Sequence, residues 1–379
     1  MAVVAGLADV TIGKSEICFI DGDGGRLIYR GYDALELAEK SSFEEVAYLL
    51  WYSCLPRHTE FKAFLDGFTG SIELPTETIM ILRMFPKAAT PMEVLRTAVS
   101  SLGHWDPDSG NTRFDACLRK AQRLTERIPL LITAHQRLRE GKEPVKPLDG
   151  RSIAYNFLYT LHDQEPDPAM VKALDVALIL HADHELNAST FAARITASTM
   201  ADIYSSVTSA IGTLKGPLHG GANIEVMKCI HEIGSLAEVE AWVKKRLAAK
   251  KKIPGFGHRV YNCEDPRTGL LRQYARRAAN LAGETHFFEM TQEIEKVVTA
   301  NTNLFPNVDL YSAALYHAMN IPEELFTPVF AMSRVVGWTS HIFEQWYNNR
   351  LIRPRAEYIG ETSLTYVPIA QRTSRRKEG

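Results

Sequence analysis

His219 stands in a glycine-rich turn in front of an expected helix. Gly220 and Gly221 follow it, and apolar residues at helical spacing begin directly afterwards. The positive end of the helix dipole is expected to lower the pKa of this imidazole and keep it neutral. A neutral imidazole can donate a hydrogen bond to a carbonyl oxygen that is becoming an enolate. The same pattern also fits a histidine with only a structural role in the turn.

His258 ends a second turn that contains two glycines, Gly255 and Gly257. Glycines allow the backbone to approach a ligand closely. A dinucleotide site needs a third glycine at fixed spacing and a preceding strand, and the sequence has neither, so we exclude a Rossmann site. The turn is either a contact for another ligand or a purely structural turn.

Asp309 falls in the first turn of another expected helix, after Pro306 and Asn307. An acidic residue at this place commonly compensates the helix dipole. If the side chain is buried in a cleft, its pKa rises and the carboxylate can act as a base. Both interpretations are compatible with the sequence.

Two further sets of residues could bind ligands. His181 and His184 are three residues apart, but their spacing matches neither His-Glu-x-x-His nor His-x-x-Glu-His. We therefore expect hydrogen bonds at a helix end and no metal site. Arg267, Arg334 and Arg353 each carry a planar fork that grips carboxylates through two hydrogen bonds. Singly, each is more typical of a solvated surface.

A short β-hairpin is expected near the start of the chain, with extended runs at 16–20 and 26–30 around Asp21–Gly25. The Asp-x-Asp spacing of this turn suggests a calcium loop. Gly25 at the fifth loop position and Tyr32 at the twelfth exclude it.

After residue 34 the pattern is helical almost everywhere. Ser42 with Glu45 forms an expected capping box, as does Ser235 with Glu238, and Thr327 is an expected N-cap. A break at 215–217 suggests the start of a second unit. The expected helices span 92–102, 112–140, 151–162, 170–181, 188–214, 222–233, 236–250, 267–282, 286–300, 308–319 and 327–348.

Composition limits the class of protein. The chain has 379 residues, 45% of them apolar and 23% charged, and a net charge of −2. These values are typical of a globular protein and give no sign of nucleic acid or membrane partners. The five cysteines are an odd number without Cys-x-x-Cys spacing. With no signal peptide or apolar run of about 18 residues, we expect a cytoplasmic protein with reduced thiols.

Taken together, these segments resemble the citrate synthase family over essentially the whole chain. The motifs that carry the resemblance are Ile20–Gly25, Tyr29–Tyr32, Ser42–Trp51, His181–Thr190, Gly216–Asn223, Gly255–Tyr261 with Asp265–Arg267, Pro306–Ser312, Ser333–Trp338 and Arg353–Arg355.

The resemblance implies an all-α, multi-helical, two-domain fold with a short N-terminal β-hairpin. Residues 1–220 and 321–379 would form a large domain that makes a homodimer, and 221–320 a small domain that closes over the active site. The implied enzyme is an acyltransferase that condenses acetyl-CoA with oxaloacetate and hydrolyses citryl-CoA to citrate and CoA. It implies no cofactor, since acetyl-CoA is a substrate.

The family's catalytic residues fall on His219, His258 and Asp309 of this sequence. The resemblance implies that Asp309 is the base, that His219 donates to the thioester oxygen, and that His258 polarises the oxaloacetate carbonyl. Further residues follow from the same motifs. For oxaloacetate they are His184, Arg267, Arg334, Phe330 and, from the partner subunit, Arg353; for CoA they are Lys251, Lys252, Ile253, Gly255, Phe256 and Gly257.

One position departs from the family pattern. Members often have Lys or Arg four residues after the loop histidine, and this chain has Asn262, which puts one CoA phosphate contact in doubt.

Three alternatives remain at the level of the sequence. The nearest is a 2-methylcitrate synthase acting on propionyl-CoA, because one methylene discriminates by only ~1–3 kcal/mol in an apolar pocket. The others are a metal-dependent hydrolase built on His181 and His184, and a non-catalytic helical scaffold.

Overall fold

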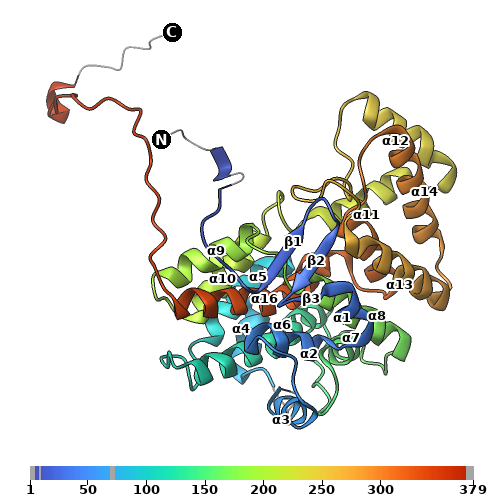
Figure 1. Cartoon of the computed structure of the whole chain (residues 1–379), viewed down its shortest axis with the longest axis horizontal. Helices are drawn as coiled ribbons and strands as arrows, with labels where there is room; N and C mark the ends of the chain where they lie inside the picture. The colour runs from blue at the N-terminus through green and yellow to red at the C-terminus, as the bar shows by residue number, and fades with distance from the viewer. Residues whose placement is uncertain (1–4, 8–9, 69–72, 373–379) are drawn as a thin grey trace. The chain divides into compact units, whose positions relative to one another are not determined.

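The computed structural model describes residues 5–7, 10–68 and 73–372. Residues 15–351 form one compact unit, and 1–14 with 352–379 form a second, so each is described by itself. The first unit is mostly helical with one small sheet (Figure 1), which confirms the expected fold class. The proposed division of the chain at 221 and 320 stays a prediction.

The elements follow the expected order along the chain. The strands are β1 (Cys18–Asp21), β2 (Arg26–Tyr29) and β3 (Tyr32–Asp33). The helices are α1 (Ala34–Lys40), α2 (Phe43–Tyr52), α3 (His58–Phe68), α4 (Thr76–Met84), α5 (Pro91–Leu102), α6 (Phe114–Arg139), α7 (Ile153–His162), α8 (Pro168–His181), α9 (Ala188–Ser198), α10 (Ile203–Leu214), α11 (Ala222–Ile233), α12 (Val239–Ala248), α13 (Pro266–Ala282), α14 (His286–Asn301), α15 (Val308–Ala318) and α16 (Phe326–Tyr347).

The three strands form one antiparallel sheet in the order β1-β2-β3, with Cys18 opposite Tyr29 and Asp21 opposite Arg26. This confirms the expected hairpin. The fully buried Tyr29 anchors it, because its hydroxyl lies 3.2 Å from the carbonyl oxygen of Ile179 and 3.0 Å from that of Asp183. The sheet is therefore attached to the end of α8, next to His184.

Helix α16 forms the centre of the core. It packs against α2, α6, α8, α9 and α10, and its side chains are buried along almost its whole length. A helix that is buried on all sides needs apolar residues all round. Helices α11 to α15 form a second cluster in which α15 packs on α11, α13 and α14; Figure 1 shows α11 to α14 in yellow and orange.

One expected helix, 188–214, is in fact two. α9 ends at Ser198 and α10 begins at Ile203, because Met200 has a left-handed φ of 66° and Asp202 caps α10 by accepting from the Ser205 amide. Serine and threonine side chains compete for backbone groups and so favour helix ends over helix interiors. The apolar spacing continues across the break, which is why periodicity missed it.

Two expected caps were wrong. Ser235 makes no capping bond, and the chain enters α12 through a 3₁₀ turn, Leu236–Glu238. Thr327 lies inside α16, which already begins at Phe326, and its hydroxyl donates to the Gly220 carbonyl at 2.9 Å. At the third position the N-cap is confirmed, because the Ser42 side chain accepts from the Glu45 amide at the start of α2; this is one of the two hydrogen bonds of a capping box.

Candidate active site

Two segments far apart in sequence pair to bring His258 and Asp309 together. Phe256 and Pro306 form an antiparallel bridge, the Gly257 amide donates to the Phe305 carbonyl at 2.9 Å, and the Asn307 amide donates to the Gly255 carbonyl at 2.9 Å. The loop that ends at His258 therefore lies along the segment that opens α15, which carries Asp309.

Gly255 makes this close pairing possible. Its φ is +83°, and a Cβ there would lie 3.0 Å from the Leu310 side chain and 3.1 Å from Val226. Glycine adopts the left-handed region without steric cost, and here a side chain also lacks space. The structure thus gives a physical reason for glycine in the expected ligand loop.

Asp309 lies in the first turn of α15, as expected, and is partly buried. Asn307 caps this turn by accepting from the Asp309 amide at 3.0 Å. Burial, chiefly, raises the pKa of Asp309 to about 6; Asp265 raises it further, while Arg267 and Arg334 lower it. The group is a stronger base than an ordinary aspartate and is still ionised at neutral pH.

His219 lies between α10 and α11, and Ser189 fixes its ring. The Ser189 backbone amide lies 3.3 Å from Nε2 and its hydroxyl 2.8 Å from the same atom. Because a backbone N–H can only donate, Nε2 is an acceptor and the ring proton sits on Nδ1. Burial, followed by Arg334, lowers the pKa of His219 to about 4. The imidazole is neutral, as expected, and burial is the largest cause of its lowered pKa.

His258 carries its proton on the other nitrogen. The amides of Val260 and Tyr261 lie 3.0 and 3.1 Å from its Nδ1. Nδ1 is therefore an acceptor and Nε2 carries the proton. Burial, followed by the positive charge of Arg267, lowers the pKa of His258 to about 4. Two neutral imidazoles thus present N–H donors through opposite ring atoms.

His184 packs beside His258, with ring centroids 5.1 Å apart. It is buried, and its Nε2 has no hydrogen-bond partner among the described residues. Burial, Arg267, His258 and Arg334 together hold the pKa of His184 well below its usual value. Buried polar atoms are rarely left unpaired, so a ligand is the natural partner for this nitrogen.

Arg267 and Arg334 are both buried, which rules out the surface interpretation for them. Arg267 holds Asp265 through two hydrogen bonds, of 2.9 and 2.7 Å. The Arg334 Nε donates to the His181 carbonyl at 2.6 Å, and its guanidinium carbon lies 4.6 Å from the centre of the Phe330 ring. Burial lowers the pKa of Arg334 to about 10, so it remains a cation at neutral pH.

Sequence reasoning assigned no role to Asp265 or Ser189. Asp265 caps α13 and also accepts from the Val308 amide at 3.3 Å, so one carboxylate joins Arg267 to the start of α15. Ser189 receives the Trp338 indole N–H at 3.1 Å, which ties His219 to α16. The Asp-Pro start of α13 is a helix-capping signal, whereas no local pattern reveals the contact of Ser189 with His219.

The remaining expected residues lie in different settings. Lys251 and Lys252 are exposed after α12, whereas Ile253 is buried. Arg353 is exposed and belongs to the second compact unit. His181 binds the Ala177 carbonyl through Nδ1 at 2.7 Å, and its ring packs on Phe330. The described residues contain no group of three His, Cys, Asp or Glu side chains placed to hold a metal ion.

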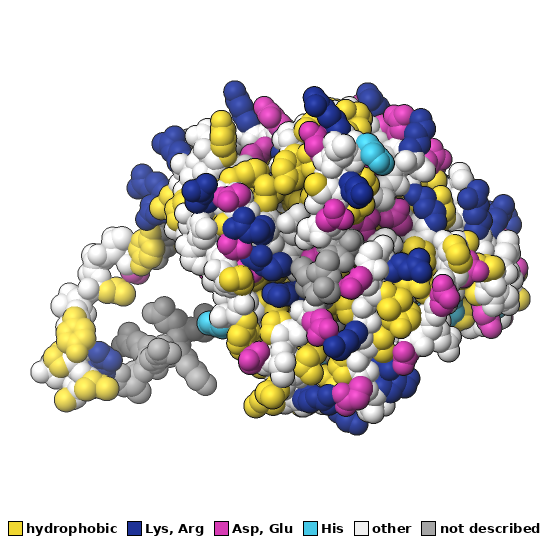
Figure 2. Space-filling view, turned by 90° about the horizontal axis from the view of Figure 1, so that it is seen from below, with side chains coloured by type: hydrophobic (Ala, Val, Ile, Leu, Met, Phe, Trp, Pro, Cys, Tyr) yellow, Lys and Arg dark blue, Asp and Glu magenta, His cyan; other side chains and the backbone are white. Residues whose placement is uncertain are grey.

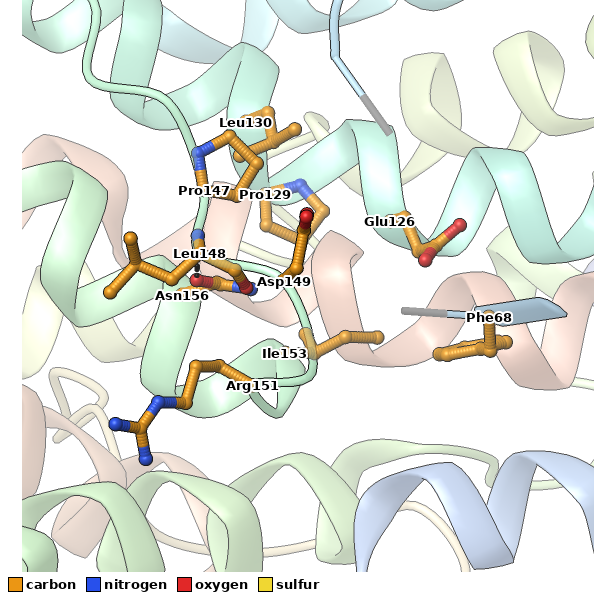
Figure 3. Close-up of a pocket in the computed structure, with 10 residues that line it drawn as sticks. All are labelled: Phe68, Glu126, Pro129, Leu130, Pro147, Leu148, Asp149, Arg151, Ile153 and Asn156. Atoms are coloured by element: carbon orange, nitrogen blue, oxygen red, sulfur yellow. Dashed lines mark hydrogen bonds between the residues drawn. The ribbon is translucent and has the colours of Figure 1, made fainter. Parts of the chain in front are cut away.

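A cavity between α6 and α7 is separate from these residues (Figure 3). Its volume of about 30 Å³ suits one or two water molecules. Glu126, whose pKa burial raises to about 9, and Phe68 line one side, and the Leu148 amide donates to Asn156 at 2.9 Å on the other. No candidate residue lines this cavity.

The surface agrees with the balanced charge of the sequence. On the face shown in Figure 2, basic and acidic side chains are interspersed. In the described part of the chain, no helix is both long and apolar enough to span a bilayer.

A sequence profile described as "Citrate synthase, C-terminal domain" matches residues 6–355. A curated relative, "Citrate synthase 2" of Bacillus subtilis, is 47% identical over 98% of this chain and 100% of its own length. The chain belongs to the citrate synthase family. Another member, the 2-methylcitrate synthase of Shewanella oneidensis, is 39% identical over 97% of this chain and 98% of its own length.

A solved structure of the family confirms the fold. The citrate synthase of the archaeon Thermoplasma acidophilum, in a ternary complex with carboxymethyl coenzyme A and oxaloacetate, has a TM-score of 0.90. It is 31% identical, and the match covers 98% of this chain and 100% of that one.

Proposed function

We propose that this protein condenses acetyl-CoA with oxaloacetate and hydrolyses the citryl-CoA to citrate and CoA. The observation that carries the proposal is the protonation pattern of three residues. Asp309 is a carboxylate of raised pKa, and His219 and His258 are neutral donors whose protons backbone amides fix on Nδ1 and Nε2. Family membership supports the same activity.

The first step is removal of a proton from the methyl group of acetyl-CoA. The Asp309 carboxylate takes this proton while electron density moves onto the thioester oxygen. The Nδ1–H of His219 donates to that oxygen and stabilises its developing charge. A neutral imidazole suits this role. The pKa for loss of its N–H proton lies closer to the pKa of an enol than the pKa of an imidazolium does.

The second step forms the new carbon–carbon bond. The carbon of the enolate attacks the ketone carbon of oxaloacetate, and the Nε2 proton of His258 passes to the ketone oxygen, which becomes a hydroxyl group. The proton that Asp309 took from the methyl group then replaces the one lost from His258, so that the imidazole is again neutral and Asp309 is again a carboxylate. The product is citryl-CoA. Water then adds to its thioester carbonyl and the carbon–sulfur bond breaks, which releases citrate and the thiol of CoA.

Binding of the dicarboxylate falls to Arg267, Arg334 and His184, with Phe330 beside Arg334. The buried Arg334 guanidinium favours an anion, since a buried charge requires compensation. Asp265 already balances the charge of Arg267, whose guanidinium can still donate a hydrogen bond to a carboxylate. The unpaired Nε2 of His184 supplies one more polar contact. The relative's complex with oxaloacetate supports this substrate class.

The assembly we propose is a homodimer in which Arg353 enters the partner's site. CoA is proposed to lie along 251–257, with Lys251 and Lys252 facing its phosphates; the exposure of these two lysines supports this.

No cofactor takes part, because acetyl-CoA is consumed as a substrate. The proposed location is the cytoplasm, where reduced thiols are usual, and all five cysteines are unpaired in the structure.

The second candidate is 2-methylcitrate synthesis from propionyl-CoA, which the Shewanella relative favours. Measurement of thiol release with oxaloacetate and each acyl-CoA separates the two. We expect the higher kcat/KM with acetyl-CoA; a higher value with propionyl-CoA would select the second candidate.

Substitutions test the chemistry itself. We expect His219→Ala and His258→Ala each to lower kcat by about 10²–10⁴-fold, because each removes a positioned donor. His58→Ala, at an exposed histidine of α3, is the matched control and should retain full activity. Wild-type protein that releases no thiol with either acyl-CoA contradicts the proposed function.

A further inference from the structure

The turn between β1 and β2 contacts the loop that follows His258, and no step of the proposed reaction uses this contact. The Asn262 amide donates to the Gly22 carbonyl at 2.9 Å. The Asn262 side-chain amide donates to Asp23 at 2.8 Å, and the Cys263 thiol lies 3.6 Å from the same Gly22 carbonyl oxygen. A segment near the N-terminus thus makes three polar contacts with the loop.

The fit between turn and loop depends on glycine. A Cβ on Gly22 would lie 2.4 Å from the carbonyl oxygen of Val260, which is a severe overlap with backbone. Gly25 has a φ of +60°, and a Cβ there would lie 3.0 Å from the Cys263 sulfur. A side chain at Gly22 must therefore push the loop away or deform the turn.

The residues held by the turn are adjacent to the ones that orient His258. Val260 and Tyr261 supply the two amides that lie 3.0 and 3.1 Å from Nδ1, and Asn262 follows directly. A shift of Val260 or Asn262 moves those two amides. The position of the His258 proton consequently depends on the β1–β2 turn.

The other end of the hairpin reaches the second histidine of the substrate site. Tyr29 binds the carbonyl of Asp183, the residue before His184. One hairpin thus contacts both Asp183, beside His184, and the loop that follows His258, and the two histidine rings lie 5.1 Å apart.

We propose that the β1–β2 turn is a positioning element for His258: through Gly22, Asp23 and Asn262 it holds the two amides that keep Nδ1 an acceptor and Nε2 a donor. Asn262 holds the turn through the hydrogen bond from its side-chain amide to Asp23. The proposal rests on the proposed function for the target of the donor, the oxaloacetate ketone.

The groups around the His258 ring determine how its protonation would change if the amides of Val260 and Tyr261 moved away. His184 and Tyr261 pack against it, and Arg267 and Asp265 act on it electrostatically. Without the two amides, the proton can occupy either nitrogen and the ring becomes more solvated. The Nε2 donor is then present for only part of the time.

Gly22→Ala tests the proposal, with Gly110→Ala as the matched control, because a Cβ on Gly110 meets no atom within 4 Å. We expect Gly22→Ala to lower kcat by about 10–100-fold, the effect of a misplacement near 1 Å, and to raise the KM for oxaloacetate but not for acetyl-CoA. Gly110→Ala should match the wild type in all three quantities.

A spectroscopic readout separates positioning from loss of stability. In ¹⁵N NMR of the wild type, His258 should show a protonated Nε2 and an acceptor Nδ1, and should stay neutral down to about pH 5 given its lowered pKa. In Gly22→Ala we expect mixed tautomers and titration at higher pH. An unchanged tautomer and an unchanged kcat would overturn the proposal, even if the variant melts earlier. Wild-type protein without activity would refute the proposed function, while the tautomer comparison still decides this inference.

An exchange of side chains at Asp23 and Asn262 provides a second test should Gly22→Ala not fold. Asn262→Asp places two carboxylates face to face, and we expect kcat to fall by about 3–10-fold, a modest loss because the pair is exposed. Adding Asp23→Asn restores an amide–carboxylate pair in reversed order and should return kcat to within about twofold of wild type. An Asn262→Asp variant with wild-type kcat, or a double variant without recovery, contradicts the role of this pair.

Discussion

At the scale of single residues, the proposed chemistry depends on which groups carry protons. Asp309, His219 and His258 all have shifted pKa values with burial as the largest cause. Burial disfavours charge, so it raises the pKa of the carboxyl group and lowers those of the imidazoles. The same physical effect therefore produces one base and two neutral donors.

This arrangement predicts the pH dependence of the reaction. Asp309 must be ionised to act as a base, and its pKa is raised to about 6. Below that pH the protonated fraction grows, so kcat/KM should fall about tenfold for each further pH unit. The histidines stay neutral over this range because their pKa values are about 4. The measurement is kcat/KM for acetyl-CoA between pH 5 and 9.

Asp309→Asn is the companion variant, because it keeps the shape of the side chain and removes the base. We expect activity too low to give a pH profile, with the fold intact by circular dichroism. A wild-type profile that stays flat down to pH 5, or an active Asp309→Asn protein, would contradict the assignment of the base.

At the scale of elements, the packing of α16 determines how closely Arg334 approaches the α8–α9 connection. Gly337 donates its amide to the Ala182 carbonyl at 3.1 Å. A Cβ there would lie 2.4 Å from that carbonyl oxygen and 2.4 Å from the Asp183 carboxylate. Arg334, one turn earlier on the same helix, donates to the His181 carbonyl. Glycine inside a helix is costly, and here close packing accounts for it.

Gly337→Ala should therefore damage both stability and substrate binding. We expect a loss of about 1–3 kcal/mol in the free energy of unfolding from overpacking, and a higher KM for oxaloacetate as Arg334 and His184 separate. Chemical denaturation and steady-state kinetics measure the two effects.

Gly269→Ala in α13 is the matched control, since its added Cβ meets no atom within 4 Å. Alanine there should stabilise the helix by about 0.5–1 kcal/mol, because glycine is a poor helix former. If both alanine variants had the same stability, the close approach of α16 would not be the reason for Gly337.

At the scale of the whole molecule, the proposed site is distributed over much of the sequence. Apart from Arg353, its residues come from the α8–α9 connection, the α10–α11 turn, the loop at 251–258, α13, α15 and α16, and all of these belong to the unit formed by 15–351. Arg353 lies in the other unit. The proposal that it serves a partner subunit therefore needs an experiment on assembly.

Mixing two inactive proteins provides that experiment. Asp309→Asn and Arg353→Ala chains are unfolded together and refolded as mixed dimers. If Arg353 completes the partner's site, each mixed dimer has one intact site, and about a quarter of wild-type activity should return, because half of the dimers are mixed. If Arg353 acts in its own chain, the mixture stays inactive. Size-exclusion chromatography of the wild type reports the dimer itself.

The sequence alone determined the helical class, the hairpin and the types of residue that carry the chemistry. Helical periodicity and turn residues are local properties, so α11, α13 and α15 and the Asp21–Gly25 turn were predictable. Local signals failed where a contact elsewhere decided the outcome. Thr327, for example, looks like a cap but donates to the Gly220 carbonyl beside His219.

Only the tertiary structure decided the protonation states of Asp309, His219 and His258 and which segments of the chain pack together around them. Burial of Asp309 and the contact of the Ser189 amide with His219 arise between segments that are distant in the chain. The Val260 amide is only two residues from His258, but the loop that aims it at Nδ1 packs against the β1–β2 turn. The near-zero net charge likewise gave no sign that Arg267 and Arg334 converge in the interior. Burial and hydrogen bonding depend on what packs around a group, and a linear pattern does not contain that information.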